Sequence, residues 1–392
     1  MIRVAFIHNG FPAGGAERIT VDIARYLHSV GGYEVFVYTT KVAESLMTDE
    51  LARIMKIRLI PSQAIQKRRS DAVERLVVSD GIDVLVQVTK PLKGIDGIRE
   101  RTGCKTVVAC HGEPFWQRYA IVYRRQKGMV RKLMWSLYNR KRYEDGTLAM
   151  RKAVERTRKE YDVSDAYTVL CEPYKRQVID VLGVHSQAAK IYPIENPERV
   201  VEDVRWDKEK IVLFCGRFEN WSKRVDRLLR IWGKVQDSMP DWRLVLVGDG
   251  ADGRMLRQMA ADMGLERVSF EGMQRNIRKY YDKASIVAMT SETEGWPLAL
   301  SEAQAHGCIG IAFGCSAGIS EILGLDGGCG FVVPPFDEDE YAETLMKVAS
   351  MSEEQKMRIR QNSVEKRRKY SPEVVAEKWK RLFDDLVARS DE

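Results

Sequence analysis

Two glutamates, Glu294 and Glu302, lie eight positions apart in the segment 291–303, around a turn that contains Gly295. The segment follows the apolar run 285–289, and its later apolar residues have helical spacing. In open α/β sheets, ligands bind beyond the carboxyl ends of the strands, where helix N-termini present free backbone amides. Such a turn can bind an anion while the two carboxylates accept hydrogen bonds from hydroxyl groups. A sugar nucleotide offers both kinds of group.

Four further motifs combine glycine with charged residues or histidine. In chain order they are Gly14-Gly15-Ala16-Glu17-Arg18, His111-Gly112, Gly216-Arg217-Phe218 followed by Lys223 and Asp226, and Val247-Gly248-Asp249-Gly250. Glycine lets the backbone approach an anion, and an arginine fork beside a lysine charge suits a diphosphate. With the two glutamates, this set resembles the retaining glycosyltransferases of family 4, which have the GT-B fold, in their bacterial polysaccharide and lipopolysaccharide types. The resemblance spans nearly the whole chain and is weakest between positions 113 and 160.

The resemblance implies an α/β protein with the GT-B fold, in which two Rossmann-like parallel-sheet domains face each other across a cleft. We expect an N-terminal acceptor-binding domain at 1–198 and a C-terminal nucleotide-sugar-binding domain at 208–371. The segment 195–198 and the polar stretch 202–210 are the expected linker. The segment 372–392 has an N-cap serine before it, a proline at its start and helical apolar spacing. We expect it to form a helix that crosses back to the first domain.

Apolar β-branched runs alternate with amphipathic stretches from end to end, which predicts parallel sheets with crossover helices. The expected strands are Val4–Ile7, Glu34–Tyr38, Ile57–Ile60, Val84–Val88, Thr106–Ala109 and Ala166–Leu170, then Ile211–Cys215, Leu244–Val247, Val268–Phe270, Ile286–Met289, Ile309–Ala312 and Gly330–Val333. The expected helices of the first half are Ala16–Ser29, Asp71–Ser79 and Tyr174–Leu182.

The resemblance also implies roles for single residues. The implied catalytic residues are Arg217, Lys223, Glu294 and His111, and the implied donor-binding and nucleotide-binding residues are Gly15, Gly216, Gly248, Gln274, Gly295, Trp296, Leu298 and Glu302. Arg217 and Lys223 would stabilise the departing diphosphate, and Glu302 would bind the ribose hydroxyls. Trp296 stands where the family commonly has phenylalanine, and we expect it to narrow or stiffen the sugar pocket. The remaining histidines, His8, His28, His185 and His306, receive no role from the resemblance.

The implied reaction retains the anomeric configuration and needs no dedicated base. In the favoured account of such enzymes, a phosphate oxygen of the donor takes the acceptor proton on the same face of the sugar. The protein then acts by positioning and by charge stabilisation. The expected donor is a nucleoside-diphosphate sugar, most readily uridine-linked, and no further cofactor is expected. The expected acceptor is a glycan or a lipid-linked glycan.

Three other patterns suggest different chemistry. Residues 248–253 spell G-x-G-x-x-G, but their two aspartates would repel a pyrophosphate and they follow the second strand of their domain. Residues 314–318 spell the nucleophile elbow G-x-S-x-G, but no histidine follows His306 to act as base. Asp337-Glu338-Asp339 contains a D-x-D, but it precedes a helical stretch, where acidic residues are favoured. We therefore expect no dinucleotide site, no esterase and no metal site.

Length and composition set wider bounds. A chain of 392 residues favours two domains. No apolar run approaches the ~18 residues that span a bilayer, and the N-terminal apolar stretch 2–7 is typical of a first strand, not a signal peptide. Seven scattered cysteines without a CxxC pair favour reduced thiols, and so a cytoplasmic location.

The net charge of +7 is concentrated in the segment 116–159, where basic residues alternate with aromatic ones. This combination suits an anionic bilayer surface, with Trp116, Tyr123 and Trp135 at the headgroup level. The protein would then lie on the inner face of the cell membrane, near a lipid-linked acceptor. The alternative is a solvated basic helix pair whose aromatic residues face the core. Nucleic-acid binding is not expected, because no recognised binding module accompanies the charge.

Two other functions stay open. A sugar-nucleotide epimerase can have the same fold, but the two glutamates with Arg217 and Lys223 argue against it. A non-catalytic GT-B-like subunit would bind sugar nucleotide or act as a scaffold. The complete charged set disfavours this alternative, and donor hydrolysis or sugar transfer would separate the two.

Overall fold

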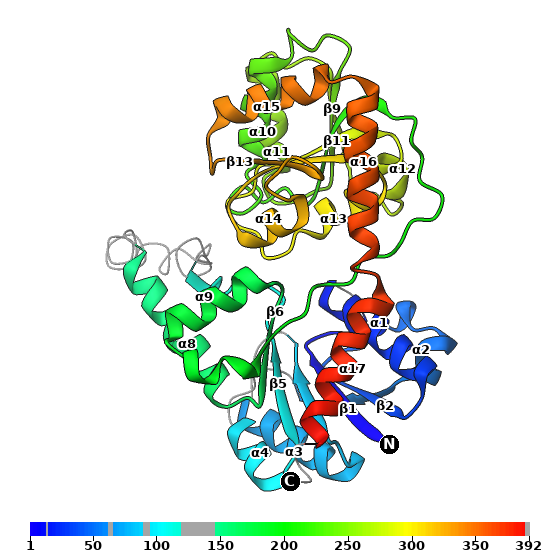
Figure 1. Ribbon diagram of the computed structural model, residues 1–392, viewed down its shortest axis with the longest axis vertical. Coiled ribbons are helices and arrows are strands. Elements are labelled where there is room, and N and C mark those ends of the chain that lie inside the picture. The colour runs from blue at the N-terminus through cyan, green and yellow to red at the C-terminus, as the bar shows by residue number, and fades with distance from the viewer. Residues whose placement is uncertain (13–14, 62–65, 89–94, 119–145, 389–392) are drawn as a thin grey trace. The chain divides into compact units, whose positions relative to one another are not determined.

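The computed structural model of the chain describes residues 1–12, 15–61, 66–88, 95–118 and 146–388. The chain divides into two compact units, unit 1 (Met1–Pro197 with Pro372–Glu392) and unit 2 (Glu198–Ser371). Each unit has its own parallel sheet with helices packed against it (Figure 1). The prediction of two Rossmann-like parallel-sheet domains is confirmed.

The described part of unit 1 forms a seven-stranded parallel sheet in the order β3-β2-β1-β4-β5-β6-β7. Its strands are β1 (Ile2–His8), β2 (Tyr33–Thr39), β3 (Lys56–Leu59), β4 (Val84–Gln87), β5 (Lys105–Ala109), β6 (Ala166–Val169) and β7 (Ile191–Pro193). Its described α-helices are α1 (Gly15–Val30), α2 (Asp49–Ile54), α3 (Gln66–Asp80), α4 (Ile95–Thr102), α8 (Thr147–Asp162), α9 (Glu172–Leu182) and α17 (Pro372–Ala388).

Helices cover both faces of the unit 1 sheet. Successive residues of β1 point to opposite faces, so Val4 and Phe6 pack in a core with α1 and α17, whereas Ala5 and Ile7 pack in a core with α3 and α4. The ring of Phe383 on α17 meets Phe6 edge to face, with 6.3 Å between centroids. The final helix therefore completes the core of the unit that contains the N-terminus, as the sequence predicts.

The described part of unit 2 forms a six-stranded parallel sheet in the order β10-β9-β8-β11-β12-β13. Its strands are β8 (Glu209–Cys215), β9 (Arg243–Val247), β10 (Val268–Gly272), β11 (Ala284–Met289), β12 (Ile309–Phe313) and β13 (Gly330–Val333). Its α-helices are α10 (Val225–Val235), α11 (Gly253–Asp262), α12 (Arg278–Tyr281), α13 (Leu298–Ala305), α14 (Ala317–Leu323), α15 (Glu338–Ser350) and α16 (Glu353–Arg368).

Two details of the elements bear on the sequence predictions. Every predicted strand is present, whereas β7 has no sequence signal, because it is a three-residue edge strand that ends in Pro193. The acidic residues at 337–339 begin α15, and the Asp337 carboxylate accepts hydrogen bonds from the backbone N–H groups of Asp339 and Glu340 at 3.1 and 3.0 Å. Asp337 is thus a helix N-cap.

The strand orders fix where ligand-binding loops can lie. In unit 1, β1 is flanked by β2 and β4, and in unit 2, β8 is flanked by β9 and β11. At such positions the connections run to opposite faces of the sheet, so the loops at the carboxyl ends separate and leave room for a ligand. Among the described helices, none is long and apolar enough to cross a membrane.

Candidate functional site

Two loops meet beyond the carboxyl ends of β8 and β11 in unit 2. The β8 loop (216–224) leads into α10, and the β11 loop (290–297) leads into α13. Backbone N–H of Glu292 donates to the carbonyl of Ser222 at 2.7 Å, and the hydroxyl of Thr290 donates to the carbonyl of Arg224 at 3.0 Å. These bonds hold the two loops side by side at the switch point of the sheet.

Lys223 and Glu294 form a close ion pair between the two loops. Lys223 Nζ donates to Glu294 Oε1 at 2.6 Å, and the hydroxyl of Ser291 donates to the same oxygen at 2.6 Å. The Glu294 side chain is only 8% exposed. A carboxylate buried this far requires such partners, and they fix its orientation before any ligand arrives.

Arg217 lies apart from this ion pair. It is the second residue after β8, its side chain is 72% exposed, and its Nη1 is 3.3 Å from Glu219 Oε1. An exposed pair of this kind stabilises the fold little. The guanidinium is therefore available to a phosphate at small energetic cost.

The β11 loop also holds a carboxylate that the resemblance did not single out. Glu292 Oε2 accepts from Arg227 Nη2 at 2.7 Å and from Arg224 Nη1 at 3.3 Å. Arg227 is buried and stacks over the Phe336 ring, 4.1 Å from its centroid. The available sequence signal is the three-residue spacing of Arg224 and Arg227, at the N-cap and in the first turn of α10.

The glycines after β8 and β9 serve the packing of their own loops. A Cβ on Gly248, whose φ is +141°, would lie 1.8 Å from the carbonyl oxygen of Gly216. A Cβ on Gly250 would lie 2.6 Å from the carbonyl oxygen of Phe218, and Phe218 N–H donates to the carbonyl of Asp249 at 3.0 Å. Close contact between these backbones accounts for the glycine pattern at 248–253 without a dinucleotide.

The remaining unit 2 residues of the predicted site have different surroundings. Leu298 begins α13, and Glu302 lies one turn further on, with its Oε2 3.4 Å from the Tyr281 hydroxyl. Burial, with Cys215 and Glu302 nearby, raises the pKa of Tyr281 well above its usual value, so this phenol is a neutral donor. Trp296 is 6% exposed and packs edge to face on Tyr370, with 5.7 Å between centroids. Gln274 follows the edge strand β10, and its amide donates to the carbonyl of Glu271 at 2.7 Å.

In unit 1, His111 follows β5 and is held by an asparagine. Its Nδ1 lies 2.9 Å from the side-chain oxygen of Asn196, which assigns the proton to Nδ1 and leaves Nε2 as an acceptor. Burial lowers the pKa of His111, and the Asn196 hydrogen bond opposes this effect only in part. The imidazole is therefore neutral at neutral pH.

His8, at the end of β1, lies in the same region, although the resemblance implies no role for it. Its Nε2 lies 2.9 Å from the Thr20 hydroxyl, and its Nδ1 is 3.5 Å from Glu17 Oε1. Burial raises the pKa of Glu17, but hydrogen bonding to His8 and to the backbone, together with the charge interactions with His8 and His111, leaves the pKa below its usual value. A usable sequence signal is that His8 and His111 both lie at the carboxyl ends of strands of one parallel sheet. Gly15 is the exposed first residue of α1, while Gly14 lies outside the described residues.

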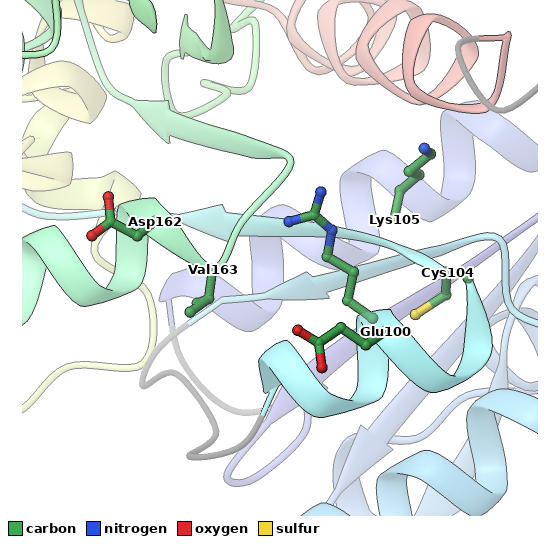
Figure 2. A pocket seen from close by; sticks show the side chains of 7 residues that line it. Glu100, Cys104, Lys105, Asp162 and Val163 are labelled. Carbon is green, nitrogen blue, oxygen red and sulfur yellow. The ribbon is translucent and has the colours of Figure 1, made fainter. Parts of the chain in front are cut away.

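Two pockets lined by described residues of unit 1 lie at opposite edges of its sheet. One, of about 350 Å³, lies beyond the carboxyl ends of β4 and β5 and includes His111 in its wall. The other, of about 630 Å³, is shown in Figure 2 and lies at the start of β5, where Glu100, Cys104, Lys105, Asp162 and Val163 are among its lining residues. Parallel α/β sheets bind ligands at the carboxyl edge, so we place the candidate site at the first pocket.

The two parallel-sheet units, with the final helix in the first unit, have the architecture of the GT-B class. The solved structure of the lipopolysaccharide outer core galactosyltransferase WaaB in its apo form has a TM-score of 0.69 at 16% identity, covering 98% of this chain and 100% of that one. Anabaena Alr3699/HepE in complex with UDP has a TM-score of 0.71 at 16% identity, covering 98% and 100%. These likenesses establish the fold.

Residues 209–351 match the family described as Glycosyl transferases group 1. The amylovoran biosynthesis glycosyltransferase AmsD of Erwinia amylovora is 30% identical over 191 residues, which is 48% of this chain and 52% of that relative. The chain spans about half or less of the length of this and two further curated relatives that it matches. The resemblance to bacterial GT-B glycosyltransferases of polysaccharide and lipopolysaccharide synthesis is confirmed, and the assignment to family 4 stays a prediction.

Proposed function

We propose that the protein is a retaining glycosyltransferase. It moves a sugar from a nucleoside-diphosphate donor, which we expect to be uridine-linked, to a glycan or lipid-linked acceptor of a bacterial surface polysaccharide. The observation that carries the proposal is the close Lys223–Glu294 ion pair, with its buried carboxylate, at the switch point of a sheet whose unit matches Glycosyl transferases group 1. HepE, which shares the fold, has been solved with UDP and with UDP-glucose.

The donor would bind at the loops after β8 and β11. The side-chain ammonium of Lys223 has three N–H donors, and among the described residues its one hydrogen bond goes to Glu294. A diphosphate oxygen can therefore accept another, while the fixed carboxylate of Glu294 accepts sugar hydroxyls. Glu302, whose Oε2 faces the Tyr281 hydroxyl, would bind the ribose hydroxyls.

The chemistry of this proposal needs positive charge more than a protein base. As the glycosidic bond to the diphosphate breaks, negative charge grows on the leaving group, and Lys223 and Arg217 would stabilise it. The acceptor oxygen bonds to the anomeric carbon on the face from which the diphosphate leaves, and its proton passes to a phosphate oxygen of the donor on that face, so the configuration is retained. Neutral His111 would accept a hydrogen bond from the donor sugar through Nε2, which orients the sugar without adding charge.

A panel of sugar nucleotides tests the proposal. We expect a uridine-linked sugar to raise the melting temperature and to be cleaved, with an α-linked donor giving an α-linked product by NMR. Glu294→Gln should lose this response, whereas Glu155→Gln, which changes an exposed carboxylate of α8, should retain it. Binding without cleavage or transfer under any acceptor mixture would favour the non-catalytic subunit instead, and inversion of configuration would refute the retaining mechanism.

We also propose that the protein associates with anionic membranes through the basic and aromatic segment 116–159. Most of this segment, including Tyr123 and Trp135, lies outside the described residues. In the described part, α8 buries Ala153 and Tyr161 and exposes Arg151 on another side. This amphipathic arrangement supports both the membrane-surface reading and the core-helix alternative.

Vesicle flotation separates the two readings. A few basic residues, each contributing about 1 kcal/mol near an anionic surface, suffice for reversible binding. Flotation should therefore require anionic lipid and weaken with salt. It should also fall when the basic residues are neutralised, in Arg124→Gln, Arg125→Gln, Arg131→Gln and Lys132→Gln together. Flotation that does not depend on lipid charge would contradict the proposed membrane association and would favour a soluble acceptor.

A further inference from the structure

The unit 1 pocket beyond β4 and β5 contains a buried hydrogen-bond acceptor that the fold leaves unused. The Gln117 side chain is 9% exposed, and its Oε1 has no hydrogen-bond partner among the described residues. The same side chain lines the 350 Å³ pocket. A buried polar atom without a partner is unfavourable for folding, so its retention at a pocket wall points to a ligand that completes it.

The loop that carries Gln117 is held in one conformation. Phe115 is buried and has a φ of 63°, a left-handed conformation that a non-glycine residue adopts only where its surroundings enforce it. Trp116 N–H donates to the carbonyl of Glu113 at 3.1 Å, and Arg118 Nη2 donates to the buried carboxylate of Glu113 at 2.6 Å. These contacts fix the positions of Trp116 and Gln117 in the pocket wall.

Trp116 supplies an apolar surface beside that acceptor. Its side chain is 44% exposed although it lines the pocket, and its indole packs over Gly112, where an added Cβ would lie 3.3 Å from Cδ1. A partly exposed tryptophan next to convergent polar groups is a surface on which the C–H face of a sugar ring can pack.

The charges in the pocket wall cancel. Among the lining side chains, Arg156 and Glu160 are the charged ones, and Arg156 Nε donates to Glu160 Oε1 at 2.8 Å. Burial raises the pKa of Glu160 in spite of Arg156, and burial lowers the pKa of His111. The wall therefore offers an anionic ligand no unpaired cation.

We propose that this pocket binds one neutral pyranose ring of the acceptor, with a C–H face on Trp116 and a hydroxyl that donates to Gln117 Oε1. The inference rests on the proposed glycosyltransferase function, because that function supplies the acceptor. A uronic acid or a phosphorylated sugar fits less well, since its charge would have to break the Arg156–Glu160 pair.

Ligand-observed NMR with simple glycosides tests the pocket. The probes are the methyl glycopyranosides of glucose, galactose, mannose, N-acetylglucosamine and N-acetylgalactosamine, with methyl glucuronide as the anionic comparator, all with the full chain and UDP. At least one neutral probe should show saturation transfer. Its affinity should fall about ten-fold in Gln117→Leu, the scale of one lost hydrogen bond. Trp116→Ala should also weaken it, Trp116→Phe should restore part of the affinity, and Gln187→Leu, an exposed glutamine outside the pocket, should match the wild type.

Stability separates a binding role from a structural one. Gln117→Leu removes an unpartnered buried oxygen, so its melting temperature should equal or exceed that of the wild type while probe affinity falls. A lower melting temperature for Gln117→Leu would mean that the amide serves the fold and would overturn the proposal. So would equal binding of methyl glucuronide, or no binding of any neutral probe.

A separate experiment tests whether the sugar ring in the pocket belongs to the acceptor or to the donor. If the pocket holds the acceptor, the rise in melting temperature caused by the sugar nucleotide should be the same in Trp116→Ala as in the wild type. If that rise is lost, the ring in the pocket belongs to the donor and the acceptor assignment is wrong. Failure of the proposed function itself would look different, because the wild-type protein would then bind no sugar nucleotide.

Discussion

The candidate sites of the two units lie at equivalent edges of two parallel sheets, but they are built from different groups. In unit 2, the charged side chains beyond β8 and β11 are paired at short range, as Lys223 with Glu294 and Arg227 with Glu292. In unit 1, the pocket beyond β4 and β5 has a neutral His111, and Gln117 keeps an oxygen without a partner among the described residues.

This difference suits two ligands of different charge. Charges that are paired in advance need little rearrangement when a diphosphate leaves, which is how preorganised sites stabilise a transition state. A neutral sugar ring gives little electrostatic energy, so it is better recognised by an apolar surface and an unfilled acceptor. One sheet architecture thus supports an electrostatic site in unit 2 and a hydrogen-bonding site in unit 1.

The largest effect should follow from breaking a pair in unit 2. Glu292→Ala leaves the buried guanidinium of Arg227 without its closest carboxylate, and removing one partner of a buried pair costs about 3–5 kcal/mol. Calorimetry should show a lower melting temperature. The double variant Glu292→Ala with Arg227→Met should recover most of the loss, because an apolar replacement of both partners is close to neutral. If Glu292→Ala alone were as stable as the wild type, the Glu292–Arg227 pair would not be important for stability.

Arg217 and Lys223 should affect activity by a similar amount but differ in their effect on stability. Each replacement by alanine should cost about 2–4 kcal/mol of transition-state stabilisation, measured as the loss in kcat/KM for the donor. Lys223→Ala should also lower the melting temperature, because Glu294 is then buried without its cation. Arg217→Ala should leave the melting temperature unchanged, since its side chain is exposed, and Arg217→Lys should restore activity only in part. Near-normal turnover in Arg217→Ala would remove it from the site.

Part of the fold and of the candidate site can be predicted from the sequence. Strand positions, sheet type and the final helix follow from periodicity and from the order of the apolar runs, and Lys223 and Glu294 follow from motifs that resemble a known family. No family motif marks Glu292, His8 or Gln117, because their roles depend on contacts with Arg227, with Glu17 and with a pocket wall that the fold alone brings together. The left-handed backbone at Phe115 is likewise enforced by tertiary packing.

A smaller effect is expected in the pH dependence of stability, which should differ between the two sites. The folded-state pKa of His111 lies below its usual value of 6.5, so its contribution to stability is present above pH 6.5 and is lost as the pH falls towards the folded-state pKa. For Asp226, burial raises the pKa, but Arg224 and Arg230 lower it more, so its contribution is present above pH 3.8 and is lost only below that value.

Calorimetry of variants at several pH values checks this order. The difference in melting temperature between the wild type and His111→Gln should shrink between pH 7.5 and 5.5. The difference for Asp226→Asn should stay constant over that range and shrink only near pH 3. Parallel pH profiles for the two variants would show that the two sites do not differ in this way.

The smallest expected effect is that of a chelator, which should leave activity unchanged. In the proposed function, Arg217 and Lys223 would supply the positive charge that a metal ion would otherwise bring to the diphosphate. The D-x-D carboxylates are committed elsewhere, because Asp337 caps α15 and Asp339 Oδ1 accepts from Lys234 Nζ at 2.7 Å. Activity that excess chelator abolishes and manganese or magnesium restores would contradict this assignment. Asp337→Asn then locates the error, because asparagine keeps the helix cap but removes the charge, so a loss of activity in this variant would place the metal there.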